Sequence, residues 1–196
     1  MTTHPEIFRV DNLRQERWVS VWKDRDGKDA YTLRRKSALL PEMCSKSMAA
    51  KLVELDHVVE LHVVRDAFDK VNPPGVDVAA QKEDLKEHLK VVLNDAKNLN
   101  FTLPIVNEFK FKGVDAFQRE YHRDAASAKG TGLTHFLKQA FEEGKTRLPR
   151  ATTRNIGKEM AKSFDFVGDN LHIEKAAEQD LLNLLHDNMV AMRIFD

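Results

Sequence analysis

The sequence predicts a mostly helical single domain of the α+β class, with a β-hairpin near its N-terminus. The 196 residues are 42% hydrophobic and 32% charged, so the chain carries enough apolar side chains for one packed core. Apolar residues recur at helical spacing through much of the chain after residue 60, which predicts helices. β-rich residues alternate within 17–22, which predicts a strand.

The composition excludes several classes of protein. No run approaches the roughly 18 apolar residues that a transmembrane helix requires, and the N-terminus lacks the basic and apolar regions of a conventional signal peptide. Cys44 is the sole cysteine, which excludes an internal disulfide and a zinc site with several thiolates from one chain. We therefore expect an intracellular protein, cytoplasmic or nuclear, that does not associate with a membrane.

The predicted hairpin accounts for the first part of the chain. Its first strand, residues 17–22, carries Trp18 and Trp22 on one face, where we expect them to join the core. An Asp-Gly turn follows, and residues 30–33 return as the second strand.

The remainder of the chain is predicted to be largely helical. Residues 61–71 and 77–93 place apolar side chains at helical spacing, and an Asn-Pro-Pro-Gly segment separates them. Residues 98–106 are extended in character, and Pro104 assigns them to an edge or irregular position. Further helices are expected at 114–128, 133–143, 155–164 and 173–192.

Charge is distributed unevenly, although the formal net charge is zero. The segment 144–162 contains six basic residues and one acidic residue, whereas 163–196 is acidic. A local basic segment can bind nucleic acid even when the whole chain is neutral. The candidates for phosphate contacts are Arg147, Arg150, Arg154 and Lys158, and a solvated basic face is the alternative.

The adjacent residues Asp56 and His57 interrupt an apolar segment. Leu55 precedes them and two valines follow, a setting in which ionisable side chains are normally paired or bound to a metal. A carboxylate can bind a hard divalent cation, and a neutral imidazole can take a proton from water. Because neighbouring residues of a regular strand point to opposite faces, a bulge or strand end is needed to bring both to one site.

A second polar motif begins 41 residues after His57. Asn98 is followed by a leucine, Asn107 stands nine positions further on, and Lys110 follows one helical turn later. Together with the Asp-His pair, these residues resemble the motif of the HNH nucleases, also named the ββα-metal or His-Me finger family. The resemblance covers 55 residues, and its motifs are short.

The resemblance implies a ββα-metal core at 53–113, with a helical insertion at 61–93 and a helical C-terminal region at 114–196. The insertion makes the distance between the two motifs longer than in the compact form of the family. Asn94, Asn98 and Asn100 therefore remain alternatives for the middle asparagine. The paired cysteines that often staple this fold are absent, so packing must hold the core together.

The same resemblance implies hydrolysis of phosphodiester bonds in nucleic acid, with DNA favoured over RNA. His57 would act as the general base, and Asn98 would orient its imidazole. Asp56 and Asn107 would ligate one divalent metal ion, Mg²⁺ or Mn²⁺, which neutralises charge on the phosphate. Lys110 would contact a phosphate. Cutting both strands of a duplex with one finger per chain would favour a homodimer or two successive nicks.

Two other functions fit the same residues. The chain could be a nucleic-acid-binding module that keeps the finger but does not cut. It could also be a helical protein-interaction domain in which the motif is a coincidence. Cleavage separates the enzyme from the binding module, and binding of a divalent metal separates the enzyme from the interaction domain.

Overall fold

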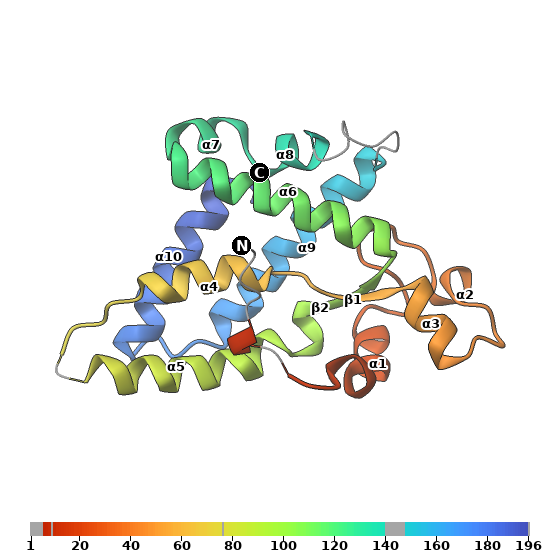
Figure 1. Ribbon diagram of the computed structural model, residues 1–196, viewed down its shortest axis with the longest axis horizontal. Helices are drawn as coiled ribbons and strands as arrows, with labels where there is room; N and C mark the ends of the chain where they lie inside the picture. The colour runs from red at the N-terminus through yellow and green to blue at the C-terminus, as the bar shows by residue number, and fades with distance from the viewer. Residues whose placement is uncertain (1–5, 9, 76, 140–147, 196) are drawn as a thin grey trace.

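The computed structural model describes residues 6–8, 10–75, 77–139 and 148–195 (Figure 1). Over these residues the protein is mostly helical and contains a two-stranded antiparallel sheet, which places it in the α+β class. In the part of the chain so described, no helix is both long enough and apolar enough to span a membrane.

The sheet pairs two segments that are far apart in the sequence. Strand β1 comprises Glu54–His57 and strand β2 comprises Leu99–Thr102, and the register places Asp56 opposite Asn100. Because each strand has only four residues, packing on both faces must stabilise the pair. The connection between the strands contains helices α4 (Leu61–Lys70) and α5 (Val78–Leu93) and the 3-10 helix η2 (Ala96–Asn98).

A single residue separates β2 from helix α6 (Pro104–Arg123). Proline is favoured in the first turn of a helix, where its missing N–H leaves no hydrogen bond unmade. The helix packs against β1 and against α8 (Leu133–Gln139). Gly113 allows the approach to α8, because a Cβ at this position would lie 3.0 Å from Leu137 Cα and 2.6 Å from its Cδ2.

Helix α6 runs without a break through the boundary expected between residues 113 and 114. One hydrophobic cluster also contains Val58 from the first of these regions and Leu185 from the second. The regions 53–113 and 114–196 therefore share both a helix and a core.

The N-terminal segment is a helix, and the predicted β-hairpin is wrong. Helix α1 covers Leu13–Asp24, and the segment that follows contains an isolated β-bridge. Helical spacing brings Trp18 and Trp22 to one side, where their ring centroids lie 4.6 Å and 5.3 Å from that of Phe101 in β2. The i, i+4 spacing of the two tryptophans fits one side of a helix as well as one face of a strand, so this spacing alone does not decide between the two.

The buried apolar residues that the structure describes form two hydrophobic clusters. The smaller one joins α1 and β2 to α2 (Lys36–Leu39) and α3 (Lys46–Leu52). The larger one contains residues of η1 (Glu6–Phe8), α4, α5, α6, α7 (Ala125–Thr131), α8, α9 (Arg150–Asp169) and α10 (Ala176–Met192). In the view of Figure 1, α6 and α5 lie on opposite sides of the molecule, with α4, α9 and α10 between them.

Candidate functional site

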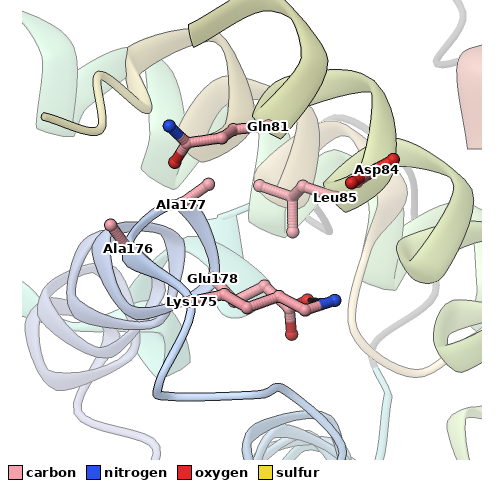
Figure 2. A pocket seen from close by; sticks show the side chains of 7 residues that line it. All are labelled: Gln81, Asp84, Leu85, Lys175, Ala176, Ala177 and Glu178. Atoms are coloured by element: carbon pink, nitrogen blue, oxygen red, sulfur yellow. Dashed lines mark ion pairs between the residues drawn. The ribbon is translucent and has the colours of Figure 1, made fainter. Parts of the chain in front are cut away.

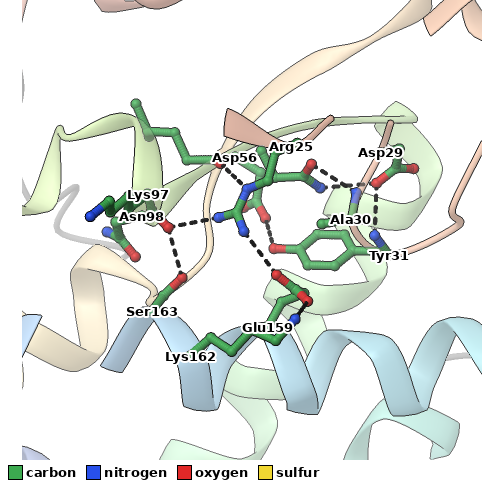
Figure 3. A network of polar contacts seen from close by, with 12 residues as sticks. Arg25, Asp29, Ala30, Tyr31, Asp56, Lys97, Asn98, Glu159, Lys162 and Ser163 are labelled. Atoms are coloured by element: carbon green, nitrogen blue, oxygen red, sulfur yellow. Dashed lines mark hydrogen bonds and ion pairs between the residues drawn. The ribbon is translucent and has the colours of Figure 1, made fainter. Parts of the chain in front are cut away.

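A buried polar cluster surrounds Asp56 in β1. Asp56 is 4% exposed, and Lys110 of α6 is fully buried. The Lys110 ammonium donates to Asp56 Oδ1 at 3.1 Å and to Glu60 Oε1 at 2.7 Å. It also donates to the backbone carbonyl of His57 at 2.7 Å. The Tyr31 hydroxyl donates to the other Asp56 oxygen at 2.5 Å (Figure 3), so both carboxylate oxygens already accept hydrogen bonds from the protein.

A single ammonium shared by two carboxylates sets the protonation of this cluster. Burial raises the pKa of Asp56 to about 7; Lys110 opposes this effect and Glu60 reinforces it. Burial lowers the pKa of Lys110, but the two carboxylates raise it above its ordinary value, so the lysine stays charged. Burial and the Asp56 carboxylate raise the pKa of Tyr31 well above its usual range, which keeps the phenol protonated.

Asn107 does not contact Asp56 and pairs instead with Glu54. Its Nδ2 donates to Glu54 Oε2 at 2.9 Å. Strand β1 and helix α6 therefore meet through two successive pairs, Glu54–Asn107 and Asp56–Lys110. The two residues predicted to share a metal ion lie in different pairs.

A divalent metal does not fit between Asp56 and Asn107 as the structure arranges them. A metal at Asp56 would have to displace the Tyr31 hydroxyl and stand beside the positive charge of Lys110. The ammonium already contacts three oxygen atoms, as a hard cation would. Because Lys110 is fully buried, it also cannot make the phosphate contact predicted for it.

His57 has a separate partner, Asn94, which follows α5. His57 Nε2 lies 2.9 Å from Asn94 Oδ1, and Asn94 Nδ2 donates to the backbone carbonyls of Phe8 and Lys90. Because these two carbonyls turn the amide oxygen toward the imidazole, the neutral ring carries its hydrogen on Nε2 and its lone pair on Nδ1. A half-buried imidazole fixed in one tautomer is suited to act as a general base.

Asn98 does not have the orienting role predicted for it. The residue is fully buried, and its Oδ1 accepts a hydrogen bond from the Val59 backbone N–H at 2.9 Å. Its Nδ2 donates to the Leu93 carbonyl at 2.9 Å. Asn98 thereby joins the end of the inserted helices to the segment after β1. Of the three alternative asparagines, Asn94 is the one that contacts His57.

A second buried network supports β2 and joins Asn100, one of the three alternative asparagines, to Asp29, which the sequence did not single out. Asp29 is fully buried and accepts hydrogen bonds from Asn100 Nδ2 and Thr102 Oγ1, each at 2.9 Å. Asn100 Oδ1 in turn accepts from the Ala30 N–H. An aspartate near a turn is ordinary in sequence, so nothing in its pattern signals burial.

Arg25 connects the end of α1 to β2 and α9, as Figure 3 shows. Its guanidinium donates to the backbone carbonyls of Leu99 and Lys97, and to Glu159 Oε2 of α9 at 2.8 Å. Ser163 Oγ of α9 donates to the same Lys97 carbonyl. These contacts hold α9 against the residues that precede β2.

A basic groove of about 770 Å³ lies between α8, α9 and the segment after α10. Its described lining residues include no carboxylate. They include six exposed cations, namely Lys138, Arg150, Arg154, Lys158, Lys162 and Arg193. Of the five residues predicted to contact phosphates, three therefore line one concave surface, Lys110 is buried, and Arg147 lies outside the described residues.

The residues predicted from the sequence thus lead to two places where function can be sought, the His57–Asn94 pair and the basic groove. Asp56 and Lys110, which were predicted to bind a metal ion and a phosphate, form an ion pair with each other in the buried cluster between β1 and α6. Comparisons of the chain with family models, with curated proteins and with solved structures found no match.

Proposed function

We propose that this protein binds nucleic acid in the basic groove. The observation that carries the proposal is the set of six exposed cations around one concave surface whose described lining contains no carboxylate. Contacts between cations and phosphates supply most of the affinity in nucleic-acid binding that is independent of sequence. None of the described acidic residues lines the groove, so the groove is attractive to a polyanion; Glu159, outside the lining, pairs with Lys162 at 2.6 Å.

The spacing of the cations on α9 suits a chain of phosphates. Arg150, Arg154, Lys158 and Lys162 recur every four residues and form a row along one side of the helix. Four residues advance the helix by about 6 Å, so the row presents a regular series of positive charges. Lys138 of α8 and Arg193 after α10 add charge from the neighbouring elements that line the groove.

An exposed aromatic ring gives the groove a surface for a base. Phe195 lines the groove and is 46% exposed. Its ring is held by Phe164 and His186, with centroid distances of 5.8 Å and 6.3 Å. Cations that follow a backbone and an aromatic ring that stacks on a base are together typical of single-strand binding. DNA is favoured over RNA by the resemblance to HNH nucleases and not by the groove itself.

Binding can be measured by fluorescence anisotropy with short labelled single-stranded DNA, duplex DNA and RNA of the same sequence. The test variant is the double charge reversal Arg154→Glu with Lys158→Glu. Both side chains are exposed, so folding should be preserved. We expect the affinity to fall by roughly an order of magnitude or more. The slope of log K against log salt concentration should become shallower by the amount that corresponds to about two phosphate contacts.

A matched control is the double reversal Lys46→Glu with Lys51→Glu on α3. These lysines are also exposed, lie outside the groove and change the net charge equally. The proposal requires the control to bind much more tightly than the groove variant. Equal binding by both variants, or no binding by the wild-type protein to any of the probes, would reject it in favour of the protein-interaction alternative.

Hydrolysis of a phosphodiester bond at His57 is a second candidate function. It is favoured by the His57–Asn94 contact at 2.9 Å, which holds the imidazole of a residue type suited to take a proton from water. The order β1, β2, α6 also follows that of a ββα finger, with the helical insertion between the strands. In this proposal Asn94 positions the base, and Lys110 supports β1 from the interior.

Incubation of supercoiled plasmid with the protein and Mg²⁺, Mn²⁺ or EDTA tests this second function. Nicking that His57→Ala abolishes without weakening DNA binding would support it. If plasmid, single-stranded DNA and RNA all remain intact while the groove binds them, the protein is the non-catalytic module. Retained nicking in His57→Ala would reject the assignment of the base.

A further inference from the structure

Two histidines and a glutamate, none of which belongs to either site described above, meet at a third place. His88 lies on α5, His172 lies between α9 and α10, and Glu178 lies in the first turn of α10. The side chain of Glu178 is 2% exposed, that of His88 is 23% exposed and that of His172 is 53% exposed. The packing of α10 on α5 brings these three segments together.

We propose that His88, His172 and Glu178 bind a divalent transition-metal ion, with zinc as the best match to the ligand set. Two imidazoles and one carboxylate form a recurrent set of protein ligands for zinc, with water in the fourth position. Each of the three residues offers one atom that can coordinate a metal ion, and these atoms lie within 4.8 Å of one another.

The distances are close to those of a coordinated ion. Ligands about 2.1 Å from a tetrahedral zinc ion stand roughly 3.4 Å apart. His88 Nδ1 lies 3.2 Å from both carboxylate oxygens of Glu178, so this pair already has the required separation. Separations of up to 4.8 Å must close by as much as about 1.4 Å. The side chain of His172 is 53% exposed, so its ring can rotate on the side that faces solvent, away from Glu174 Oε1 at 3.6 Å.

The carboxylate is held in place by the backbone of the same loop. The His172 N–H donates a hydrogen bond to Glu178 Oε2, which ties the loop to the first turn of α10. The rings of His88 and His172 stack with their centroids 4.9 Å apart and an angle of 20° between their planes. Such contacts around the ligands reduce the rearrangement that metal binding requires.

A pocket beside Glu178 leaves room for further ligands. Its volume is about 260 Å³, and Figure 2 shows Glu178 and Lys175 on one side of it and Gln81 and Asp84 on the other. A water molecule or a small anion could complete the coordination of the ion from this side.

Lys175 competes with a cation for the carboxylate. Its ammonium lies 3.4 Å from Glu178 Oε1, but the side chain is 54% exposed. It can therefore turn into solvent when a divalent ion arrives, at little cost. A simple His88–Glu178 ion pair is the alternative use of these residues, and it would not require His172.

The experiment is a titration of the tag-free, chelator-treated full chain with Zn²⁺ by calorimetry, and with Co²⁺ by visible absorption. We expect one ion per chain and a Co²⁺ spectrum typical of tetrahedral coordination. His172→Ala should weaken Zn²⁺ binding by more than about 100-fold, because loss of an outer-shell partner alone costs 10–100-fold. The matched control is His135→Ala, an exposed histidine on α8, which should bind normally.

Lys175→Met provides a second test that a structural role would not pass. Removal of the competing ammonium should increase the affinity for Zn²⁺. If Glu178 only stabilises the fold through its ion pairs, the same substitution should instead weaken those ion pairs and give no gain in Zn²⁺ affinity. The absence of stoichiometric binding by the wild-type chain would overturn the proposal. Unchanged affinity in both His172→Ala and Lys175→Met would overturn it as well.

Discussion

Lys110 Nζ lies 3.1 Å from Asp56 Oδ1, in a pair from which solvent is almost entirely excluded. The lysine belongs to the second turn of α6 and the aspartate to β1, so this contact joins the helix to the sheet. Glu60 shares the same ammonium at 2.7 Å. The cluster thus has one positive charge opposite two carboxyl groups, and both its stability and its titration follow from that imbalance.

Removal of the cation should destabilise the protein strongly. Lys110→Met keeps much of the side-chain volume but leaves Asp56 and Glu60 buried without a cation. Loss of one partner of a buried pair typically costs about 3–5 kcal/mol, because the remaining charge is uncompensated. Urea unfolding should show a decrease of this size in the free energy of unfolding.

Lys112→Met is the control for this substitution. Lys112 is 51% exposed and pairs with Glu108 at the surface of the same helix. Exposed ion pairs contribute less than about 1 kcal/mol, so the control should unfold near the wild-type midpoint. Equal effects of the two substitutions would contradict the assigned role of Lys110.

The raised pKa of Asp56 predicts a pH dependence of stability. The pKa is about 7 in the folded protein against the ordinary value of 3.8, so between these values the folded state binds more protons than the unfolded state. The contribution of this group to the free energy of unfolding is fully present below pH 3.8. It decreases as the pH rises from there and is lost above the folded-state pKa of about 7. The decrease is at most about 1.4 kcal/mol per pH unit.

Asp56→Asn removes that titration while keeping a group that can accept hydrogen bonds. The difference in unfolding free energy between wild type and variant, measured at several pH values, should shift in favour of the variant up to pH of about 7 and then stay constant. A difference independent of pH would show that Asp56 titrates normally.

Two glycines within helices should respond oppositely to alanine. In Gly113→Ala the new Cβ would meet Leu137 Cα at 3.0 Å, so α6 and α8 must separate and the protein should be destabilised. In Gly157→Ala the Cβ would have no neighbour within 4 Å, and helix propensity should stabilise the protein by up to about 1 kcal/mol. Thermal unfolding of both variants measures the contrast, and a stabilised Gly113→Ala would contradict the close approach of the two helices.

The contact with Asn94 predicts the tautomer of His57. Because Asn94 Nδ2 is used by two carbonyls, the neutral imidazole should carry its hydrogen on Nε2. Nitrogen NMR of the labelled protein distinguishes the two tautomers directly, whether or not the protein has catalytic activity. Asn94→Ala should lose this preference, and a wild-type ring protonated on Nδ1 would be inconsistent with an orienting role of Asn94.

Phe195 should distinguish single-stranded from duplex probes. Stacking of one base on an aromatic ring contributes about 1–3 kcal/mol, so Phe195→Ala should weaken the binding of single-stranded DNA by that amount. Duplex DNA, with its bases already stacked, should be affected less. Phe111→Ala is the control, because Phe111 is similarly exposed at 42% but lies on α6. An equal loss in both variants would exclude stacking on Phe195.

The sequence by itself determined the elements whose signal is local. The apolar side chains of α5 and α10 recur every three or four residues, and this period identifies a helix without reference to the rest of the chain. The row of cations on α9 was likewise visible as a basic segment. The mostly helical character of the chain also follows from such local patterns, because the helical signal extends through most of it. The α+β class rests on the β1–β2 sheet, whereas the first strand of the predicted N-terminal hairpin lies in helix α1.

Only the tertiary structure decided the partners of the polar residues. Asp56 contacts Lys110, and Asn107 contacts Glu54, at sequence separations above fifty residues. A hydrogen bond depends on the positions of two atoms to within a few tenths of an ångström. Sequence spacing predicts only which face of a helix or strand carries a side chain, so it cannot identify the partner. Helix α1 formed for a related reason, since its tryptophans pack on Phe101 of a strand far along the chain.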